Sequence, residues 1–545
     1  MPVLSVALPS LRSLVLSLAL AAAQEPPAQV TPPATSQEAI DQGLLRMLPQ
    51  GEVRGIDLET CLRLAFANNL GLKALAMGVE ITDTAIEESL GAFDPTYYTM
   101  AEGSHRTAFQ GFGFTLGANR LLESATDLFT IGTGVRGASP SGLQYDVGLS
   151  FDHNFNTFDS IDFQTGQLSV RRSEYVTNQV GLSLTQPLLR GFGSTVNKGP
   201  LYEARNSSRL ARLELEQQML DLGFRVVQAF WDYRFAIEAA KTAEETLGVA
   251  RELLDINEKK WKAGVFTEVD VLRASDEVQR RQANLIEARS IVGNNQDTLR
   301  RLIFALEGEA EWKLNYFPRK AAELPVPPVM DWDAVVRETL ERRPDLAAKR
   351  IGLENLDIEI ALAENARLPG LNLLAAYGYS SQGSNFGNSL DFLEDREFPS
   401  YSAGLSLEVP IGNRTAAARL QRSRIQRLQA EVELHDLEAG VVEEVRRALR
   451  TVESSREKIT AATESRGLAE KLYRKERKRL EAGEGTSFLV REAQRDLFVA
   501  RNNELRALLD HEIALAELSR ARGTLLENYG IALPQPRDEQ GSIFY

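Results

Sequence analysis

The residue types that carry chemistry are scarce in this chain, and their spacing assembles no catalytic or metal site. Its single cysteine, Cys61, excludes an internal disulfide framework and a cluster of cysteine ligands. The four histidines, His105, His153, His435 and His511, lie far apart in the sequence, which argues against histidine-based metal binding or catalysis. We therefore predict no catalytic residue, no metal site and no cofactor, and the chain is not expected to be an enzyme.

Short motifs for nucleotide or hydrolase chemistry are missing or misplaced. The segment Gly132–Gly137 formally matches G-x-G-x-x-G, but it lies in a strand-like pattern, is followed by Pro140 and leads into no helix, as a dinucleotide site requires. The sequence contains no G-x-x-x-x-G-K-[ST], H-E-x-x-H or G-x-S-x-G. Cys61 shares the apolar face of a predicted helix with Leu58 and Leu62, which predicts a buried structural thiol.

Composition alone describes a soluble protein. The chain has 545 residues, 25% of them charged and 43% hydrophobic, with a mean hydropathy of −0.24. Its length predicts two to four domains. With 62 Lys and Arg against 76 Asp and Glu, the net charge is −14, which excludes a nucleic-acid partner because such a protein needs a basic face.

The N-terminus contradicts an intracellular location. Residues 1–23 predict a secretory signal peptide, because Arg12 precedes the apolar run Leu14–Leu20 and three alanines follow it. Residues 24–52 are rich in Pro, Gln and Thr and predict a flexible lead-in. No later stretch is long and apolar enough for a spanning helix. An exported chain of this kind is periplasmic, extracellular or an outer-membrane barrel.

The chain contains one pattern twice, and this duplication organises it. Three segments match in the same order: Leu62–Pro95 with Val336–Pro369, Gly181–Leu189 with Gly404–Ile411, and Lys260–Ala274 with Arg479–Ala493. The first copy carries about 51 extra residues between Pro95 and Pro187. We predict a first repeat at 53–331, a second repeat at 332–533 and a C-terminal tail at 534–545.

Very long helices are predicted in both repeats. Apolar residues recur at three and four positions through proline-poor segments: Leu201–Lys262, Thr267–Leu306, Ala416–Glu481 and Ser487–Leu526. A helix of about 60 residues is about 90 Å long, far beyond the helices of ordinary globular cores. Antiparallel coiled-coil pairs are the structure typical of such lengths.

Other segments alternate with a period of two, which predicts strands. Apolar residues on one face oppose small or polar residues on the other in Phe129–Val135, Tyr145–Phe151, Gln179–Thr185 and Ser402–Val409. Weaker strands are expected at Thr96–Gly103 and Leu371–Ser380, whose tyrosines Tyr97, Tyr98, Tyr377 and Tyr379 suit a membrane interface. The pattern fits a membrane barrel and equally a half-buried soluble sheet; export, duplication and the long helices favour the barrel.

Prolines mark the predicted junctions between these elements. Pro95 and Pro369 stand where the first helix of each repeat gives way to a strand. Pro187 and Pro410 stand where a strand gives way to the long helix. Proline ends a strand ladder and disfavours helix at the preceding residue, so it suits both kinds of boundary.

Two motifs make a family resemblance specific. The motif G-L-S-L-x-x-P precedes a long helix in both repeats, and A-G-x-x-T lies in both helical breaks. This plan, from about Ile56 to Leu533, resembles the TolC-type outer-membrane efflux protein family. The pieces that carry the resemblance are Gly181–Leu189, Gly404–Ile411, Ala263–Asp270 and Ala482–Glu492.

The resemblance implies a fold, a location and partners. The fold is mixed, an all-α coiled coil plus a membrane β-barrel, in which tandem-duplicated protomers form a trimeric shared β-barrel continued by a long periplasmic α-barrel. The implied function is a passive exit duct of a tripartite efflux or type I secretion system in the outer membrane of a diderm bacterium. Implied partners are two further copies, outer-membrane lipid, a periplasmic adaptor protein and an inner-membrane pump of the RND, ABC or MFS type.

Physical chemistry supports a shared barrel, because so few strands cannot close a pore alone and open edges in lipid leave backbone groups unpaired. The family usually supplies four strands per protomer. Here the extra residues contain two more alternating segments, Phe129–Val135 and Leu143–Asn154, joined by the turn Gly137–Gly142. This hairpin either widens the barrel or stands outside it, and we favour the first.

The helical break of the first repeat carries candidate entrance residues. Gly264 and Gly483 end their helices, Thr267 suits an N-cap, and Asp270 lies at the N3 position of a capping box. Capping alone explains Asp270. The resemblance adds that this position lies at the periplasmic entrance, where acidic side chains and interhelical links hold the tunnel shut.

Two further acids are candidates for the constriction, Glu268 and Glu492, although a solvated helix face explains both. The second repeat has Leu489 where the first has Asp270, so the constricting network is only partly present. An acidic ring would favour cations. The predicted adaptor surface comprises Gly264, Val265, Phe266, Thr267, Gly483, Glu484 and Gly485.

One alternative of a different class stays open at this point, a soluble periplasmic coiled-coil scaffold whose strands form a small sandwich. The sequence names neither the exported substrate nor the pump.

Overall fold

The computed structural model describes residues 47–48, 53–115, 118–161, 168–304, 313–319, 332–385, 387–389, 399–482 and 484–531. The predicted signal peptide (1–23), nearly all of the lead-in (24–52), the tail (534–545) and Gly483 lie outside these residues.

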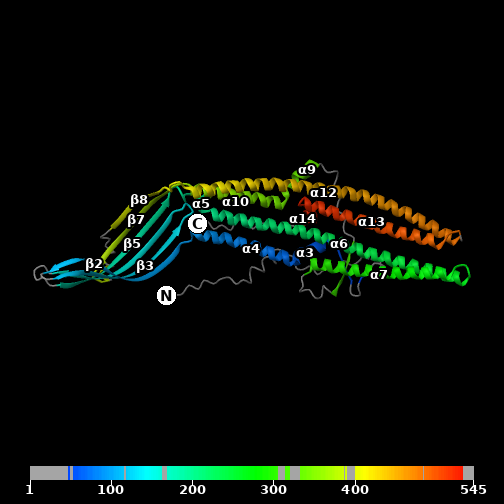
Figure 1. The fold of residues 1–545 in the computed structure, drawn as a ribbon, viewed down its shortest axis with the longest axis horizontal. Coiled ribbons are helices and arrows are strands. Elements are labelled where there is room, and N and C mark those ends of the chain that lie inside the picture. Colours follow the sequence, from blue (N-terminus) through cyan, green and yellow to red (C-terminus); the bar gives the residue numbers. More distant parts are fainter. Residues whose placement is uncertain are drawn as a thin grey trace.

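The protein is elongated, with a sheet at one end and helices running to the other (Figure 1). The helices of the first repeat are α3 (Leu58–Asn68), α4 (Leu70–Leu90), α5 (Ser194–Asn197), α6 (Gly199–Lys262) and α7 (Glu268–Ile303). Those that follow are α9 (Trp332–Arg342), α10 (Pro344–Ala366), α12 (Arg414–Glu481), α13 (Ser487–Ala521) and α14 (Leu525–Asn528). At 64 and 68 residues, α6 and α12 are each about 100 Å long.

The first helical segment of each repeat is divided in two, which the sequence pattern did not predict. Asn69 ends α3, and its side chain accepts a hydrogen bond from the Leu72 amide at 3.1 Å to cap α4. Arg343 takes the equivalent place between α9 and α10, where Pro344 opens the new helix. Asn69 and Arg343 align with each other in the sequence duplication, so the break belongs to the repeated unit.

One six-stranded antiparallel sheet contains all the predicted strands. Its strands, in the order β2-β3-β4-β5-β7-β8, are β2 (Thr96–Thr115), β3 (Ala118–Ala138), β4 (Gln144–Ile161), β5 (Leu168–Pro187), β7 (Gly370–Gly383) and β8 (Pro399–Glu408). The extra hairpin β3–β4 lies inside this sheet, between β2 and β5, rather than outside it. Its turn is closed by the Ser139 amide, which donates to the Leu143 carbonyl at 2.8 Å.

The four predicted junction prolines lie at the boundary between sheet and helices. Pro95 and Pro369 directly precede β2 and β7. Pro187 is the last residue of β5, and Pro410 follows the end of β8 at Glu408.

The helices pack side by side, and their order across the layer changes along the helical body. Next to the sheet the neighbours run α12, α10, α6, α4; towards the far end they run α12, α13, α6, α7. Each repeat therefore ends in one antiparallel hairpin, α6–α7 or α12–α13. The predicted coiled-coil pairs are confirmed.

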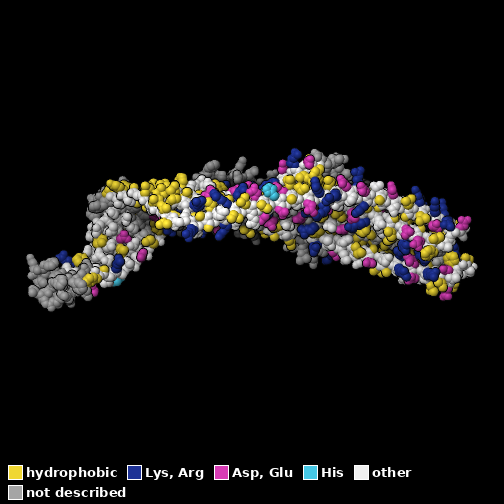
Figure 2. All heavy atoms as spheres, turned by 45° about the horizontal axis from the view of Figure 1, so that its top comes forward, with side chains coloured by type: hydrophobic (Ala, Val, Ile, Leu, Met, Phe, Trp, Pro, Cys, Tyr) yellow, Lys and Arg dark blue, Asp and Glu magenta, His cyan; other side chains and the backbone are white. Residues whose placement is uncertain are grey.

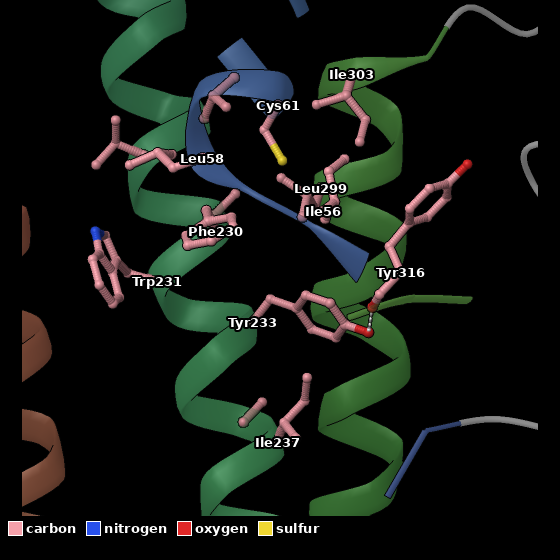
Figure 3. Close-up of a cluster of buried hydrophobic side chains, with 14 of the residues drawn as sticks. Ile56, Leu58, Cys61, Phe230, Trp231, Tyr233, Ile237, Leu299, Ile303 and Tyr316 are labelled. Atoms are coloured by element: carbon pink, nitrogen blue, oxygen red, sulfur yellow. Dashed lines mark hydrogen bonds between the residues drawn. The ribbon is translucent and has the colours of Figure 1, made fainter. Parts of the chain in front are cut away.

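The main core lies midway along the helical body, where α6 meets α3 and α7 (Figure 3). Phe230, Tyr233 and Cys61 are fully buried there, and burial raises the pKa of the Cys61 thiol far above its ordinary value. The Tyr233 hydroxyl donates to the Tyr316 carbonyl at 2.5 Å. Tyr316 belongs to β6 (Asn315–Pro318), which pairs in parallel with β1 (Val53–Ile56), a small sheet that the sequence did not predict.

Candidate functional site: a channel wall and its helical tips

The two helix hairpins end in short turns at the end of the molecule remote from the sheet (Figure 1). In the first turn, Gly264 adopts a φ of 78°, a left-handed conformation that glycine accepts without strain. Its amide donates to the Trp261 carbonyl at 2.8 Å and closes the end of α6. Val265 follows and is 69% exposed, so the turn presents an apolar side chain to its surroundings.

Asp270 caps the helix that leaves this turn. The Thr267 amide and hydroxyl donate to its carboxylate at 3.1 and 2.8 Å. These hydrogen bonds hold the pKa of Asp270 below its ordinary value, so the side chain is ionised at neutral pH. Glu268 lies exposed in the same first turn of α7. The geometry thus accounts for Asp270 as a capping residue, and its role at an entrance stays a prediction.

The second turn is built differently. The amides of Glu484 and Gly485 both donate to the Arg479 carbonyl, at 2.9 and 3.0 Å. A Cβ at Gly485 would lie 3.0 Å from the Leu480 amide nitrogen, so a side chain here would force the turn to shift. Leu489 is 40% exposed at the start of α13, where the first repeat places Asp270.

Glu492, the third predicted acid, is paired within its own helix. Arg495 lies one turn further along α13, and its guanidinium is 2.7 Å from the Glu492 carboxylate. The pair is half exposed, which is the arrangement expected of a solvated helix face.

Exposed apolar side chains surround both turns: Val265, Val269, Leu272, Phe488 and Leu489. Phe266 is partly covered, with the Lys260 ammonium 5.0 Å from its ring centroid. Apolar groups gathered at the end of a largely charged helical body are typical of a protein contact surface.

A ladder of ion pairs joins the hairpins of the two repeats. Its acids lie on α6 and its arginines on α13 or α12: Asp221 with Arg520 at 3.2 Å, Asp232 with Arg506 at 3.2 Å, Glu245 with Arg501 at 3.4 Å and Glu252 with Arg477 at 3.3 Å. The last pair lies nearest the turns. Sequence reasoning missed this inter-repeat ladder, because its partners are more than 200 residues apart.

The outer face of the sheet is apolar near the helices. A row of paired residues crosses all six strands on this face: Tyr97, Val135, Val147, Leu182, Tyr377 and Tyr401. Leu405 and Leu407 are more than 60% exposed. In Figure 2 hydrophobic side chains gather where the helices meet the sheet, whereas charged ones cover the remote half of the body.

The opposite face of the sheet is polar and hollowed. A hollow of about 430 Å³ is lined by residues of all six strands, most of them polar or small. Tyr98 lies here, not with Tyr97 on the outer face, and its hydroxyl donates to the Asp146 carboxylate at 3.0 Å. A Cβ at Gly134 would meet the Tyr98 hydroxyl at 2.8 Å. Tyr98 is therefore not a membrane-interface residue. The sequence could have predicted this, because neighbouring residues of a strand such as Tyr97 and Tyr98 point to opposite faces.

Among the described residues, no group of three His, Cys, Asp or Glu side chains is placed to hold a metal ion. In that same part of the chain, no helix combines the length and apolarity needed to cross a bilayer.

A duplicated protomer with a sheet that is apolar outside and polar inside, continued by long helical hairpins, is one wall segment of a channel. The model of the outer membrane efflux protein family matches residues 144–303 and 335–524. The chain therefore belongs to the outer membrane efflux protein family. It is an outer-membrane efflux channel and not an enzyme, and the soluble scaffold alternative is wrong.

Relatives and solved structures agree with this assignment. The chain is 26% identical to the alkaline protease secretion protein AprF of Pseudomonas aeruginosa, over 64% of this chain and 69% of that one. It is 22% identical to the outer membrane protein TolC of Vibrio cholerae, over 72% and 84%. The fold is similar to the Campylobacter jejuni CmeC outer membrane channel, with a TM-score of 0.58, 17% identity and 86% of each chain covered.

Proposed function

We propose that three copies of this chain form a passive exit duct, which carries substrates from an inner-membrane pump and a periplasmic adaptor across the periplasm and the outer membrane. One observation carries this proposal: the protomer has two open, apolar sides that fit each other. The proposed units are the two repeats, residues 53–331 and 332–533, side by side in each protomer.

The open sides of the helical body match near the sheet. On α4, Leu70, Met77 and Ile81 are each more than 60% exposed at helical spacing. On α12, at the opposite side of the same layer, Ile425, Leu428 and Val432 are 54–68% exposed. Because the two stripes lie on different sides of one protomer, their contact is head-to-tail, and such contacts close into a ring when the rotation between copies closes.

The match continues towards the tips. Leu272 and Ile286 of α7 are each more than 60% exposed, and α7 forms one side of the body there. Leu468 and Leu472 of α12 are 67% and 47% exposed on the other side. The family resemblance gives three as the number of copies.

At the tips we propose the adaptor contact. Apolar side chains around the two turns, above all Val265, supply the surface, together with the backbone of Gly264, Glu484 and Gly485. Asp270, Glu268 and Glu492 are proposed to line the entrance. One relative is named for alkaline protease secretion, and the outer membrane protein OpmQ of Pseudomonas putida, 27% identical to this chain, is named for pyoverdine export. Because similar chains are named for such different substrates, we infer that the pump, not the duct, selects the substrate.

Fractionation and electrophoresis test the proposal. The chain should sediment with outer membranes and migrate in mild detergent as a trimer that heating dissociates. Recovery as a soluble periplasmic monomer would overturn it.

A further inference from the structure

Both edges of the sheet are open within the described part of the chain: β2 forms one edge and β8 the other. Unpaired backbone groups cost several kcal/mol each in hydrocarbon. Edges that face water usually carry charges or prolines against pairing. Here Thr96–Gly103 contains one charge, Glu102 on the polar face, and Ser400–Leu407 contains none. These edges are suited to pairing.

A second copy of this chain fits both edges in direction and in face. β2 follows α4 and runs away from the helices, whereas β8 runs towards α12, so β8 of one copy and β2 of the next are antiparallel. Tyr401 and Leu405 of β8 lie on the apolar face, as do Tyr97 and Ala101 of β2. A register slip of one residue would turn one apolar set inward.

We propose that β8 pairs with β2 of the next subunit in the register that sets Glu408 opposite the partner subunit's Thr96. Three copies then close a barrel wall of eighteen strands, in which the β3–β4 hairpin is an integral part. This inference rests on the proposed trimer and adds the strand number and the register.

The helix junctions set this register. Thr96 directly follows Pro95, and Glu408 lies two residues before Pro410, so β2 begins and β8 ends at the boundary between sheet and helices. Within one subunit, the row of paired residues that starts at Thr96 crosses the sheet and reaches Ser402. Ser402 is six residues from Glu408, so each subunit contributes a stagger of six residues.

The resulting barrel has ordinary geometry. Three subunits accumulate a stagger of about 18 residues over 18 strands; with a rise of ~3.3 Å and a strand spacing of ~4.8 Å, the strands tilt by about 35°. Membrane barrels tilt by about 35–45°. If the stagger were smaller by two residues per subunit, the strands would tilt by only about 25°. A larger stagger would place Thr96 beyond the end of β8 and leave it unpaired. The wall would be about 34 Å across.

The β3–β4 hairpin has the faces of a barrel wall. Val135 and Val147 lie in the apolar row between Tyr97 and Leu182, whereas Arg136 and its cross-strand partner Asp146 project to the hollowed face. A hairpin standing in water outside the barrel would not need this alternation.

Cysteine cross-linking tests the register, because the single native Cys61 is fully buried. In the proposed register Leu405 lies opposite the partner subunit's Thr99. A variant with Leu405→Cys and Thr99→Cys should form covalent dimers and trimers on oxidation in outer membranes. The matched control, Leu405→Cys with Gly103→Cys, separates the thiols by about 13 Å and should stay uncross-linked.

The outcomes separate the register from the trimer. Cross-linking of the control, or none in either variant while the heat-sensitive trimer persists, would overturn the register and leave the trimer standing. Loss of the trimer in the unmodified protein would overturn the proposed function itself.

Quenching by brominated lipids tests the strand number. The native tryptophans lie between residues 231 and 332 of the sequence, whereas the strands of the six-stranded sheet come from residues 96–187 and 370–408. A Val147→Trp variant should be quenched severalfold more than Ser150→Trp, which places the indole on the opposite face of β4. Equal and weak quenching of both would place the hairpin outside the barrel wall and exclude eighteen strands.

Discussion

The ion pair nearest the helical turns allows a quantitative test of how the entrance is held shut. For the proposed duct, we expect opening to move the α6–α7 and α12–α13 tips apart, and Glu252 of α6 joins Arg477 of α12 at 3.3 Å. We choose Glu252→Gln, which removes the charge and keeps the shape. Arg477 retains its pair with Glu481 in its own helix, so the change isolates the link between repeats.

Removing one Glu252–Arg477 pair should destabilise the closed state modestly, and removing all three pairs of the proposed trimer should destabilise it more. Both side chains are about half exposed, so one pair contributes about 0.3–1 kcal/mol. If three copies open together, the closed state loses about 1–3 kcal/mol of stabilisation. The ratio of open to closed channels then rises about 5- to 150-fold.

Single-channel recording in planar bilayers measures this ratio. The matched control is Asp255→Asn, on the same helix, whose carboxylate pairs with Lys259 one turn away. The effect of Glu252→Gln should shrink in about 1 M salt, where the screening length falls to about 3 Å. Equal open probabilities for both variants, or an effect that salt does not change, would refute the reasoning.

Three further predictions concern stability and assembly. Gly134→Val should prevent correct sheet formation, because its Cβ would meet a backbone carbonyl at 2.6 Å; trimer yield measures this, with Gly181→Val as control, where the nearest atom to the added Cβ is 4.0 Å away. Tyr233→Phe should lower the free energy of unfolding by about 1 kcal/mol through the lost hydrogen bond to Tyr316, read from thermal melts. Because its folded pKa is lowered, Asp270 stabilises its helix above the ordinary carboxyl pKa and loses this effect as pH falls through the folded pKa; Asp270→Asn should flatten that acid dependence of melting.

Local patterns predicted the elements well. The long helices followed from apolar spacing and the lack of proline, and the strands from alternation, because both signals repeat over many residues. The breaks at Asn69 and Arg343 were missed, since a cap is a single residue inside a continuing apolar pattern. The small β1–β6 sheet was missed because four residues carry too little alternation.

Long-range arrangement was beyond such patterns. Whether the β3–β4 hairpin joins the sheet depends on its pairing with β2 and β5. The sequence of the hairpin showed only that apolar and polar residues alternate in it. The capping box at Asp270 was predictable because both partners lie within one helical turn. The ladder partner of Glu252 lies in another repeat, and no local spacing points to it.

A net charge of −14 together with an acidic ring at the entrance would favour cations in the tunnel, and the structure shows where that charge acts. The acids of the ladder face arginines of the other repeat. Glu492 is paired with Arg495, and both Glu268 and Asp270 lie at the N-terminus of α7, where the helix dipole offsets negative charge. All three candidate acids at the tips are thus compensated locally. Cation preference at the entrance should therefore be weaker than the net charge suggests, and the geometry of the hairpin tips should contribute more to closure than an acidic ring does.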